Sequence, residues 1–311
     1  MWLFKVPKIS FVVIAYNRAE YIRECMDSIL TQDIDKEVIC IDDCSTDGTF
    51  EILNEYKRKN KCVRVYQNEE HLGTCLTRIT GLSHCKGEFA LQIDADDRLF
   101  PDSMQRIYQD AMKTGADIVE FRNASNGDVS YQKYISDASE VLSGDLIRYY
   151  AGESGNKISN TLCNKLVTKK VYRDSLPKMN KDLRQSNYSD VVYILWHFLK
   201  TAKTFSFSDV FGYFYYCDRG MTRLLPEVER LKNYCGFAIT KVELESVYGR
   251  SEALNRKWNT VCNQAALSFL NLPENERDNN WYLLDELMSR QDSQFLIQAA
   301  KANSKISAIG S

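Results

Sequence analysis

Hydrophobic positions in the first part of the chain alternate between two spacings. Residues 9–15 form a short apolar run rich in β-branched side chains, which is typical of a buried strand. The next apolar positions, Ile22, Cys25, Met26 and Ile29, recur at helical spacing. The same alternation predicts strands at 38–41, 63–66, 89–93 and 117–121 and helices at 49–59, 74–85 and 101–113. Alternating elements of this kind predict an α/β fold, a mainly parallel sheet with helices on both faces.

The alternation becomes less regular after residue 121. The elements predicted beyond it are strands at 129–135 and 205–216 and helices at 145–150, 191–200, 227–241 and 281–288. We therefore predict an α/β domain at 1–225, with two halves that divide near residue 121, followed by a helical C-terminal extension at 226–311.

Composition removes several functional classes. The chain has 311 residues, and its 40 Lys and Arg against 42 Asp and Glu give a formal net charge of −2. So balanced a charge provides no field that would attract nucleic acid, and we expect no nucleic-acid partner. The 10 cysteines are scattered and include no CxxC pair, so they are interpreted as mostly buried thiols in a reducing cytoplasm.

Nothing in the sequence resembles a secretion signal or a membrane span. Residues 1–8 contain only a brief apolar cluster, and the longest apolar runs, 11–15 and 191–199, fall far short of the roughly 20 residues that cross a bilayer. We expect a cytoplasmic protein whose membrane association, at the inner face of the cytoplasmic membrane, is at most peripheral.

Two acidic turns follow predicted strands. Asp94, Asp96 and Asp97 come directly after residues 89–93, and such a concentration of negative charge repels itself unless a cation neutralises it. Mg²⁺ or Mn²⁺ fits, because hard cations bridge carboxylates to substrate phosphates. The alternative is an Asp-rich turn that caps the following helix.

The second acidic turn contains Asp42 and Asp43 after the strand at 38–41. A carboxylate there can accept the imide N–H of a uracil or a ribose hydroxyl, and we assign this role to Asp43. Capping of the next helix is the expected role for Ser45, Thr46 and Asp47. Because ligands bind at the carboxyl ends of parallel strands, both turns are expected to face one site.

Taken together, these segments resemble the inverting glycosyltransferase family 2, which has the GT-A fold. The resemblance covers residues 9–114 closely and extends more loosely to residue 222. Its motifs are residues 14–18, 41–49, Leu72-Gly73 with Arg78 and Gly81, 87–89 and 94–97. Two positions depart from the family pattern, since Cys44 replaces a usual Gly and Ile79 a frequent Asn.

The resemblance implies roles for donor-side residues. Tyr16 and Asp43 would hold the nucleobase, Asp94 would face the ribose, and Asp96 would bind the metal on the diphosphate. The other implied donor-binding residues are Arg18, Arg78 and Arg219. His71 precedes the glycine of one motif and would line the same pocket. On this basis residues 1–121 form the donor half and 122–225 the acceptor half.

A weaker resemblance assigns the catalytic base. Asp190 precedes the apolar helix at 191–200, where many family members have an acidic base, although a helix cap there is the alternative. Arg219 follows an aromatic run and would approach the leaving diphosphate, but a surface salt bridge is an equal alternative.

The resulting hypothesis is transfer of a sugar from a nucleotide diphosphate, with UDP expected, to a hydroxyl of a saccharide or lipid-linked saccharide. The setting implied is bacterial surface-polysaccharide synthesis, with homo-oligomer contacts through the C-terminal helices. Two alternatives stay open. A nucleotidyltransferase would ordinarily carry a Gly-rich phosphate loop after Ala15, which is absent. A non-catalytic nucleotide-sugar-binding protein would not need Asp190.

Overall fold

A computed structural model describes most of the chain. The described residues are 5–126, 140–154, 157–180, 189–219 and 240–273, together with 228, 275–277 and 280. The strand expected at 129–135, the helix at 281–288 and most of the helix at 227–241 lie outside these ranges, as does the proposed boundary at residue 225.

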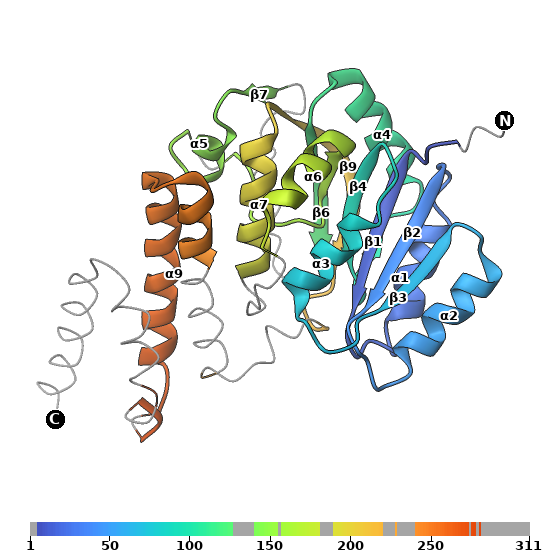
Figure 1. Ribbon diagram of the computed structural model, residues 1–311, viewed down its shortest axis with the longest axis horizontal. Coiled ribbons are helices and arrows are strands. Elements are labelled where there is room, and N and C mark those ends of the chain that lie inside the picture. The colour runs from blue at the N-terminus through green and yellow to red at the C-terminus, as the bar shows by residue number, and fades with distance from the viewer. Residues whose placement is uncertain are drawn as a thin grey trace, which may run out of the picture.

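The N-terminal half of the fold is a parallel sheet. Its strands are β1 (Ile9–Ala15), β2 (Lys36–Asp42), β3 (Val63–Gln67) and β4 (Phe89–Asp94), in the order β3-β2-β1-β4. Each is rich in β-branched or aromatic residues, and β1 is buried along its whole length. In the register of the sheet, Ala15 is paired with Asp42 and Ile14 with Asp94. The carboxyl ends of β1, β2 and β4 therefore lie at one edge (Figure 1).

The other half of the sheet is mixed. The short strand β8 (Lys165–Thr168) lies antiparallel between β4 and β6 (Ile118–Ser125). Strand β9 (Thr204–Tyr215) is parallel to β6, while β5 (Arg98–Leu99) and β7 (Val141–Ser143) pair antiparallel with β9. Strand β6 continues to Ser125 rather than ending at residue 121, because its partly exposed second half pairs with β9. The hydrophobic pattern could not indicate that extension.

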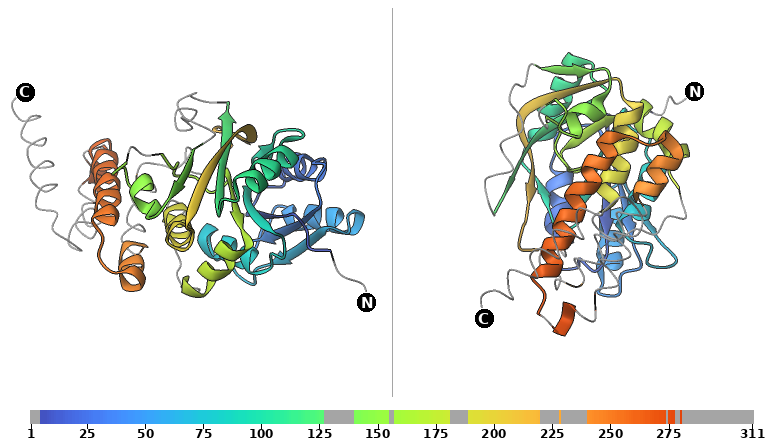
Figure 2. Two further views of the ribbon diagram at one scale, coloured as in Figure 1. Left: turned by 90° about the horizontal axis from the view of Figure 1, so that it is seen from above. Right: turned by 90° about the vertical axis from the view of Figure 1, so that its left-hand side faces the viewer.

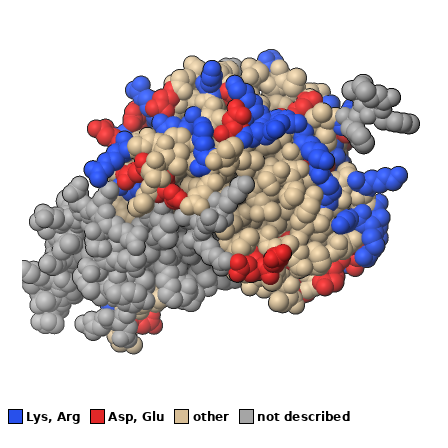
Figure 3. Space-filling model, in the orientation of Figure 1, with Lys and Arg blue, Asp and Glu red and all other residues tan. Residues whose placement is uncertain are grey.

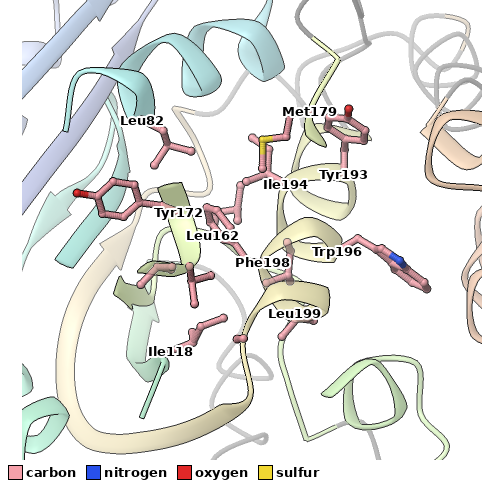
Figure 4. Close-up of a cluster of buried hydrophobic side chains, with 14 of the residues drawn as sticks. Leu82, Ile118, Leu162, Tyr172, Met179, Tyr193, Ile194, Trp196, Phe198 and Leu199 are labelled. Carbon is pink, nitrogen blue, oxygen red and sulfur yellow. The ribbon is translucent and has the colours of Figure 1, made fainter. Parts of the chain in front are cut away.

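Helices cover both faces of the sheet. One buried cluster lies under α1 (Ile22–Leu30), α2 (Thr49–Lys59) and α4 (Ser103–Thr114). The other lies under α3 (Thr74–Ser83), α5 (Leu146–Tyr150), α6 (Lys169–Ser175) and α7 (Ser189–Thr201). A 3₁₀ turn at Leu176–Lys178 follows α6. Figure 4 shows α7 side chains such as Phe198 packing toward the centre of this second cluster. The predicted α/β architecture is confirmed.

The C-terminal helices pack on the second cluster. Helix α9 (Glu252–Leu270) lies beyond α7, at the end of the molecule opposite α2 (Figures 1 and 2). Leu244 and Leu254 belong to the same buried cluster as α7. His197 on α7 hydrogen-bonds the Tyr248 hydroxyl with 2.7 Å between Nδ1 and the oxygen. The described part of the extension is thus joined to the α/β core through apolar and polar contacts.

The distribution of charged side chains and the burial of the cysteines agree with what the sequence predicts. On the face drawn in Figure 3, basic and acidic side chains both occur, in several separate groups. No disulfide joins any two of the nine described cysteines, and six of them are buried. Within the described ranges, every helix is too short or too polar to cross a bilayer.

Candidate active site

The loops after β1, β2 and β4 are tied to one another by side-chain hydrogen bonds. The Asn17 backbone N–H donates to Ser45 Oγ over 2.9 Å, and the Asn17 side-chain oxygen accepts from the Thr46 backbone N–H. The Arg18 backbone N–H donates to Thr49 Oγ1 over 2.8 Å. Two polar turns that are far apart in the sequence thus form one rigid rim.

Of the three residues expected to cap α2, Asp47 bonds to the start of the helix, whereas Ser45 and Thr46 bond to Asn17. Asp47 Oδ1 accepts the Thr49 backbone N–H, and its Oδ2 accepts the Ala19 N–H, so it orders both loops. Cys44 has a φ of 66°, in the left-handed region that favours glycine. The glycine usual in the resembling family would relieve the steric cost that a side chain carries in this region.

Asp43 anchors the loop that precedes α3. Its Oδ1 accepts the Leu72 backbone N–H and its Oδ2 accepts the Gly73 N–H, each over 2.8 Å. The Asn68 side-chain amide donates to Oδ1, and His71 Nδ1 lies 2.9 Å from Oδ2. With both oxygens so engaged, Asp43 shapes the loop; the nucleobase contact stays a prediction.

Tyr16 and His71 form an aromatic stack on the same rim. Their ring centroids are 4.0 Å apart and their planes are inclined by 26°. The His71 side chain is about half exposed. A flat aromatic surface beside Asp43 is suited to a nucleobase.

The three carboxylates after β4 face in different directions. Asp94 Oδ1 accepts from Arg78 Nη2 over 2.6 Å, and Asp96 Oδ2 accepts from Arg18 Nε over 3.1 Å. Asp97 is buried and instead accepts the Tyr213 hydroxyl and the backbone N–H of the residue that follows β9. Asp97 therefore joins the turn to β9, and Asp94 and Asp96 are the members left for a ligand.

Electrostatics of the turn favour a cation beside Asp96. Burial raises the pKa of Asp96, and the like charge of Asp94 raises it further, while Arg18 opposes both effects. The pKa of Asp97 is also raised, chiefly by burial. Added positive charge would relieve this repulsion.

The donor set at this turn fits a shared metal ion rather than a closed cage. Among the described residues, no three His, Cys, Asp or Glu side chains gather around one point in a way that would hold a metal ion by themselves. Mg²⁺ and Mn²⁺ commonly take one or two protein carboxylates and complete their shell with phosphate and water. The Asp96 carboxylate fits that arrangement.

Arg78 lies between α7 and the acidic turn at residues 94–97, called here the donor-side turn. Its side chain is only 5% exposed. Nε donates to Asp190 Oδ2 over 2.9 Å, Nη2 donates to Asp94 Oδ1, and Nη1 donates to the Gln92 side-chain oxygen over 3.3 Å. The structure therefore brings Asp94 and Asp190 onto one guanidinium.

Asp190 is in the first turn of α7 and is 1% exposed. Oδ2 bonds to Arg78, whereas the buried Oδ1 has no hydrogen-bond partner among the described residues. Burial raises the pKa of the Asp190 carboxyl, and Arg78 opposes that shift. A buried carboxylate with one unused oxygen, beside the donor-side turn, has the chemistry of a proton acceptor.

Arg219 contacts α1 and the residue that follows β9. Nη1 donates to Glu24 Oε2 over 2.6 Å, and the guanidinium lies 3.4 Å from the Tyr216 ring centroid. These are the contacts of the salt-bridge alternative. Approach to a diphosphate stays a prediction.

Several residues of the site were not predicted from the sequence. The Cys163 thiol donates to Asp94 Oδ2 over 3.4 Å. The Tyr213 hydroxyl donates to Asp97 Oδ2 and accepts the Asp94 backbone N–H over 3.3 Å. Gln92 contacts Arg78 from within β4. A polar Gln in an otherwise apolar strand was the available signal for Gln92.

Comparison with known proteins gives a consistent result. The model of the family described as "Glycosyl transferase family 2" matches residues 10–195. A cholesterol galactosyltransferase of Borreliella burgdorferi is 27% identical over 222 residues, which are 67% of this chain and 59% of that protein. A poly(ribitol-phosphate) beta-glucosyltransferase of Bacillus spizizenii is 30% identical over 68% of this chain and 32% of its own length. The chain thus spans less than two thirds of either relative.

Solved structures share the fold. S. aureus TarS 1-349 in complex with UDP-GlcNAc superposes with a TM-score of 0.66 at 20% identity, over 91% of this chain and 81% of the other. The mannosyltransferase PcManGT from Pyrobaculum calidifontis, in complex with GDP-Man and Mn²⁺, gives a TM-score of 0.54 at 14% identity over 98% and 81%.

Proposed function

The chain belongs to glycosyl transferase family 2 and has the expected GT-A fold, and we propose that it transfers a sugar, with inversion, from a UDP-sugar to an acceptor hydroxyl. One observation carries this proposal above the others. Arg78 joins Asp94, on the donor-side turn, to the buried Asp190 on α7. A donor site and a candidate base are therefore in contact.

The donor occupies the rim formed by the loops after β1, β2 and β4. The Tyr16–His71 stack supplies an aromatic surface for the base, and Asp43 holds the adjoining loop in shape. Asp94 faces the ribose from the end of β4. Arg18 lies beside Asp96, where positive charge supports the diphosphate.

Asp96 would hold a divalent cation together with the diphosphate. When bound, Mn²⁺ or Mg²⁺ neutralises charge that develops on the leaving group. Arg18, which already offsets part of the Asp96 charge, remains close to the same phosphates.

Asp190 acts as the general base in a single displacement. The acceptor hydroxyl loses its proton to the free Oδ1 of Asp190, its oxygen bonds to the anomeric carbon, and the bond from that carbon to the diphosphate breaks. Attack on the side opposite to departure inverts the configuration.

We assign the acceptor to a saccharide or lipid-linked saccharide of a bacterial surface polysaccharide. The support is the kind of polymer named for the Bacillus spizizenii relative, which glucosylates poly(ribitol-phosphate). The donor half is assigned to residues 1–121, the acceptor half to 122–225, and assembly of copies to the helical extension. A cytoplasmic location, with peripheral contact to the membrane, fits such an acceptor.

Protection against thermal unfolding tests the donor assignment. Purified protein is heated with a panel of UDP-, GDP- and dTDP-sugars, with Mn²⁺ or with EDTA. A rise in Tm with one UDP-sugar that requires Mn²⁺ supports the proposal. Equal protection in EDTA would contradict the proposal that a metal ion links Asp96 to the diphosphate. Protection only by a GDP- or dTDP-sugar would show that the donor is not a UDP-sugar.

Near-complete burial of Asp190 favours one second candidate, a protein that binds nucleotide sugars without turnover. Release of UDP from the protecting sugar nucleotide, with water or saccharides as acceptors, distinguishes the two. Binding without any release would replace the enzymatic proposal.

A further inference from the structure

We propose that Arg78 is a positioning residue, which holds the Asp190 carboxylate in place for proton transfer and ties its charge to Asp94. The resemblance implies a donor contact for Arg78; in the structure its buried guanidinium bonds to Asp94 and Asp190. This inference rests on the proposed function, because it concerns the base of that reaction.

The geometry of the guanidinium supports this role. Nε and Nη2 lie on one edge of the planar group, and each donates to a different carboxylate, Asp190 at 2.9 Å and Asp94 at 2.6 Å. The third bond, to Gln92, fixes the remaining Nη1. With its donors so directed and 5% of its side chain exposed, Arg78 presents little surface to a nucleotide.

The bond from Arg78 also determines which oxygen of Asp190 is free. Oδ2 is held by Nε, and within the described part of the chain Oδ1 is the oxygen without a hydrogen bond. A base needs one lone pair that is directed at the acceptor, and a carboxylate held at its other oxygen is restricted in rotation. Arg78 therefore sets the direction of Oδ1 without touching either substrate.

The groups around Asp190 shift its pKa in opposite directions. Arg78 and Cys75 face it from α3, and Asp94 faces it from the end of β4. Burial raises the pKa of the Cys75 thiol, which leaves that group neutral. Arg78 is the main group that lowers the pKa of Asp190, with a smaller effect from the Val191 backbone N–H, against burial and the negative charge of Asp94. Without Arg78, the buried base would hold a proton over more of the pH range.

Direct titration of Asp190 tests the inference without an acceptor. In protein labelled with ¹³C at the aspartate side-chain carboxyls, the Asp190 signal is the one that disappears in Asp190→Asn. Arg78→Met is expected to raise the pKa of Asp190 by about one to three units, the usual effect of an adjacent opposite charge. A midpoint that does not move would overturn the proposal.

Two further variants keep the test decisive. Arg78→Lys retains the positive charge but cannot bond both carboxylates at once through one rigid edge. We therefore expect it to raise the pKa of Asp190 by less than Arg78→Met does. If Arg78→Met does not fold, the result for Arg78→Lys decides the question. Arg64→Met is the matched control, because it removes an arginine ion-paired to Glu37. Its Asp190 midpoint should equal that of the wild type, and an equal shift there would also overturn the inference.

Kinetics separate this inference from the proposed function. With UDP-GlcNAc as donor and water as acceptor, Arg78→Lys should lower kcat, leave KM for the donor unchanged and move the acid limb of the pH profile upward. A raised KM with an unmoved limb means a donor contact and contradicts positioning. If Asp190→Asn keeps the wild-type rate, the base assignment fails, whatever the Arg78 variants show.

Discussion

Tyr16 and His71 stack with ring centroids 4.0 Å apart, at the edge of the sheet where the acidic turns converge. Tyr16→Ala removes one ring of this pair, and we expect UDP affinity to fall about tenfold, since aromatic contact with a base contributes roughly 1–3 kcal/mol. Isothermal titration with UDP measures the change.

The control for Tyr16 is a second stack of the same kind. The ring centroids of Tyr66 and His84 are 3.9 Å apart, on the α3 side of the sheet. Tyr66→Ala should leave UDP affinity as it was. Equal losses in the two variants would mean that general destabilisation, rather than base stacking, explains the effect.

Removal of the Asp96 carboxylate should abolish the effect of divalent cations on donor binding. In Asp96→Asn the size and much of the polar character are kept, but the charge that would hold the cation is lost. UDP titrations with Mn²⁺ and with EDTA are expected to converge in this variant while differing in the wild type. Persistent stimulation by Mn²⁺ in Asp96→Asn would place the cation elsewhere.

Loss of the Asp190 carboxylate should slow transfer and spare binding. We expect Asp190→Asn to lower the turnover rate by about 10²–10⁴, the usual contribution of a general base. UDP affinity should change little, because the hydrogen bond of Asp190 is to Arg78, which in turn bonds the donor-side turn. Near wild-type transfer by a folded variant would show that Asp190 is not the base.

His197 should make the protein sensitive to mild acid. Burial lowers the pKa of this ring to about 4, whereas 6.5 is its ordinary value. Between these values the unfolded chain binds a proton that the native state does not, so stability falls as pH drops from about 6.5 toward about 4, by up to about 3 kcal/mol. Denaturant unfolding across this window measures the loss.

Two variants identify the group responsible. His197→Gln cannot titrate here and should lose stability less steeply with acid. Tyr248→Phe removes the hydroxyl bonded to Nδ1 but keeps the imidazole, so its acid sensitivity should remain. The same slope in His197→Gln as in the wild type would assign the effect to other residues.

Leu254 tests whether the helical extension is a separate domain. Its side chain is 1% exposed and lies in the cluster that contains α7. Leu254→Ala should cost about 2–5 kcal/mol, and unfolding should remain a single transition that shifts as a whole. Val242→Ala, at a position that is 56% exposed, is the control. Two transitions of which only one moves would support independent domains.

Local pattern was sufficient for the donor half of the fold. The strand at Ile9–Ala15 and the helix at Thr49–Lys59 were predicted with the bounds that the structure has. Each is a continuous segment whose apolar positions repeat at the spacing of its own element, and each is bounded by polar turns. Since parallel strands end at one edge, the convergence of Asp43 and Asp94 on a common rim also followed from sequence.

The acceptor half depended on contacts that no local pattern records. Lys165 is polar and was not expected in a strand, yet it is 1% exposed in β8, where its ammonium lies 3.1 Å from the Glu120 carboxylate. Likewise Asp97 was grouped with Asp94 and Asp96 as a carboxylate near a cation. In the structure it instead accepts the hydroxyl of Tyr213, 116 residues away. Buried charges of this kind are explained by their partner, and the partner is found only in three dimensions.

The Arg78–Asp190 bond also bears on the order in which the chain folds. It closes a loop of 112 residues, and ordering so long a segment costs conformational entropy before the contact is gained. During synthesis, β1 to β4 leave the ribosome well before α7, so the parallel sheet can form while Arg78 and Asp94 still lack their third partner. The base should therefore reach its place late, and a nascent chain that already has an ordered sheet would not yet be able to catalyse transfer.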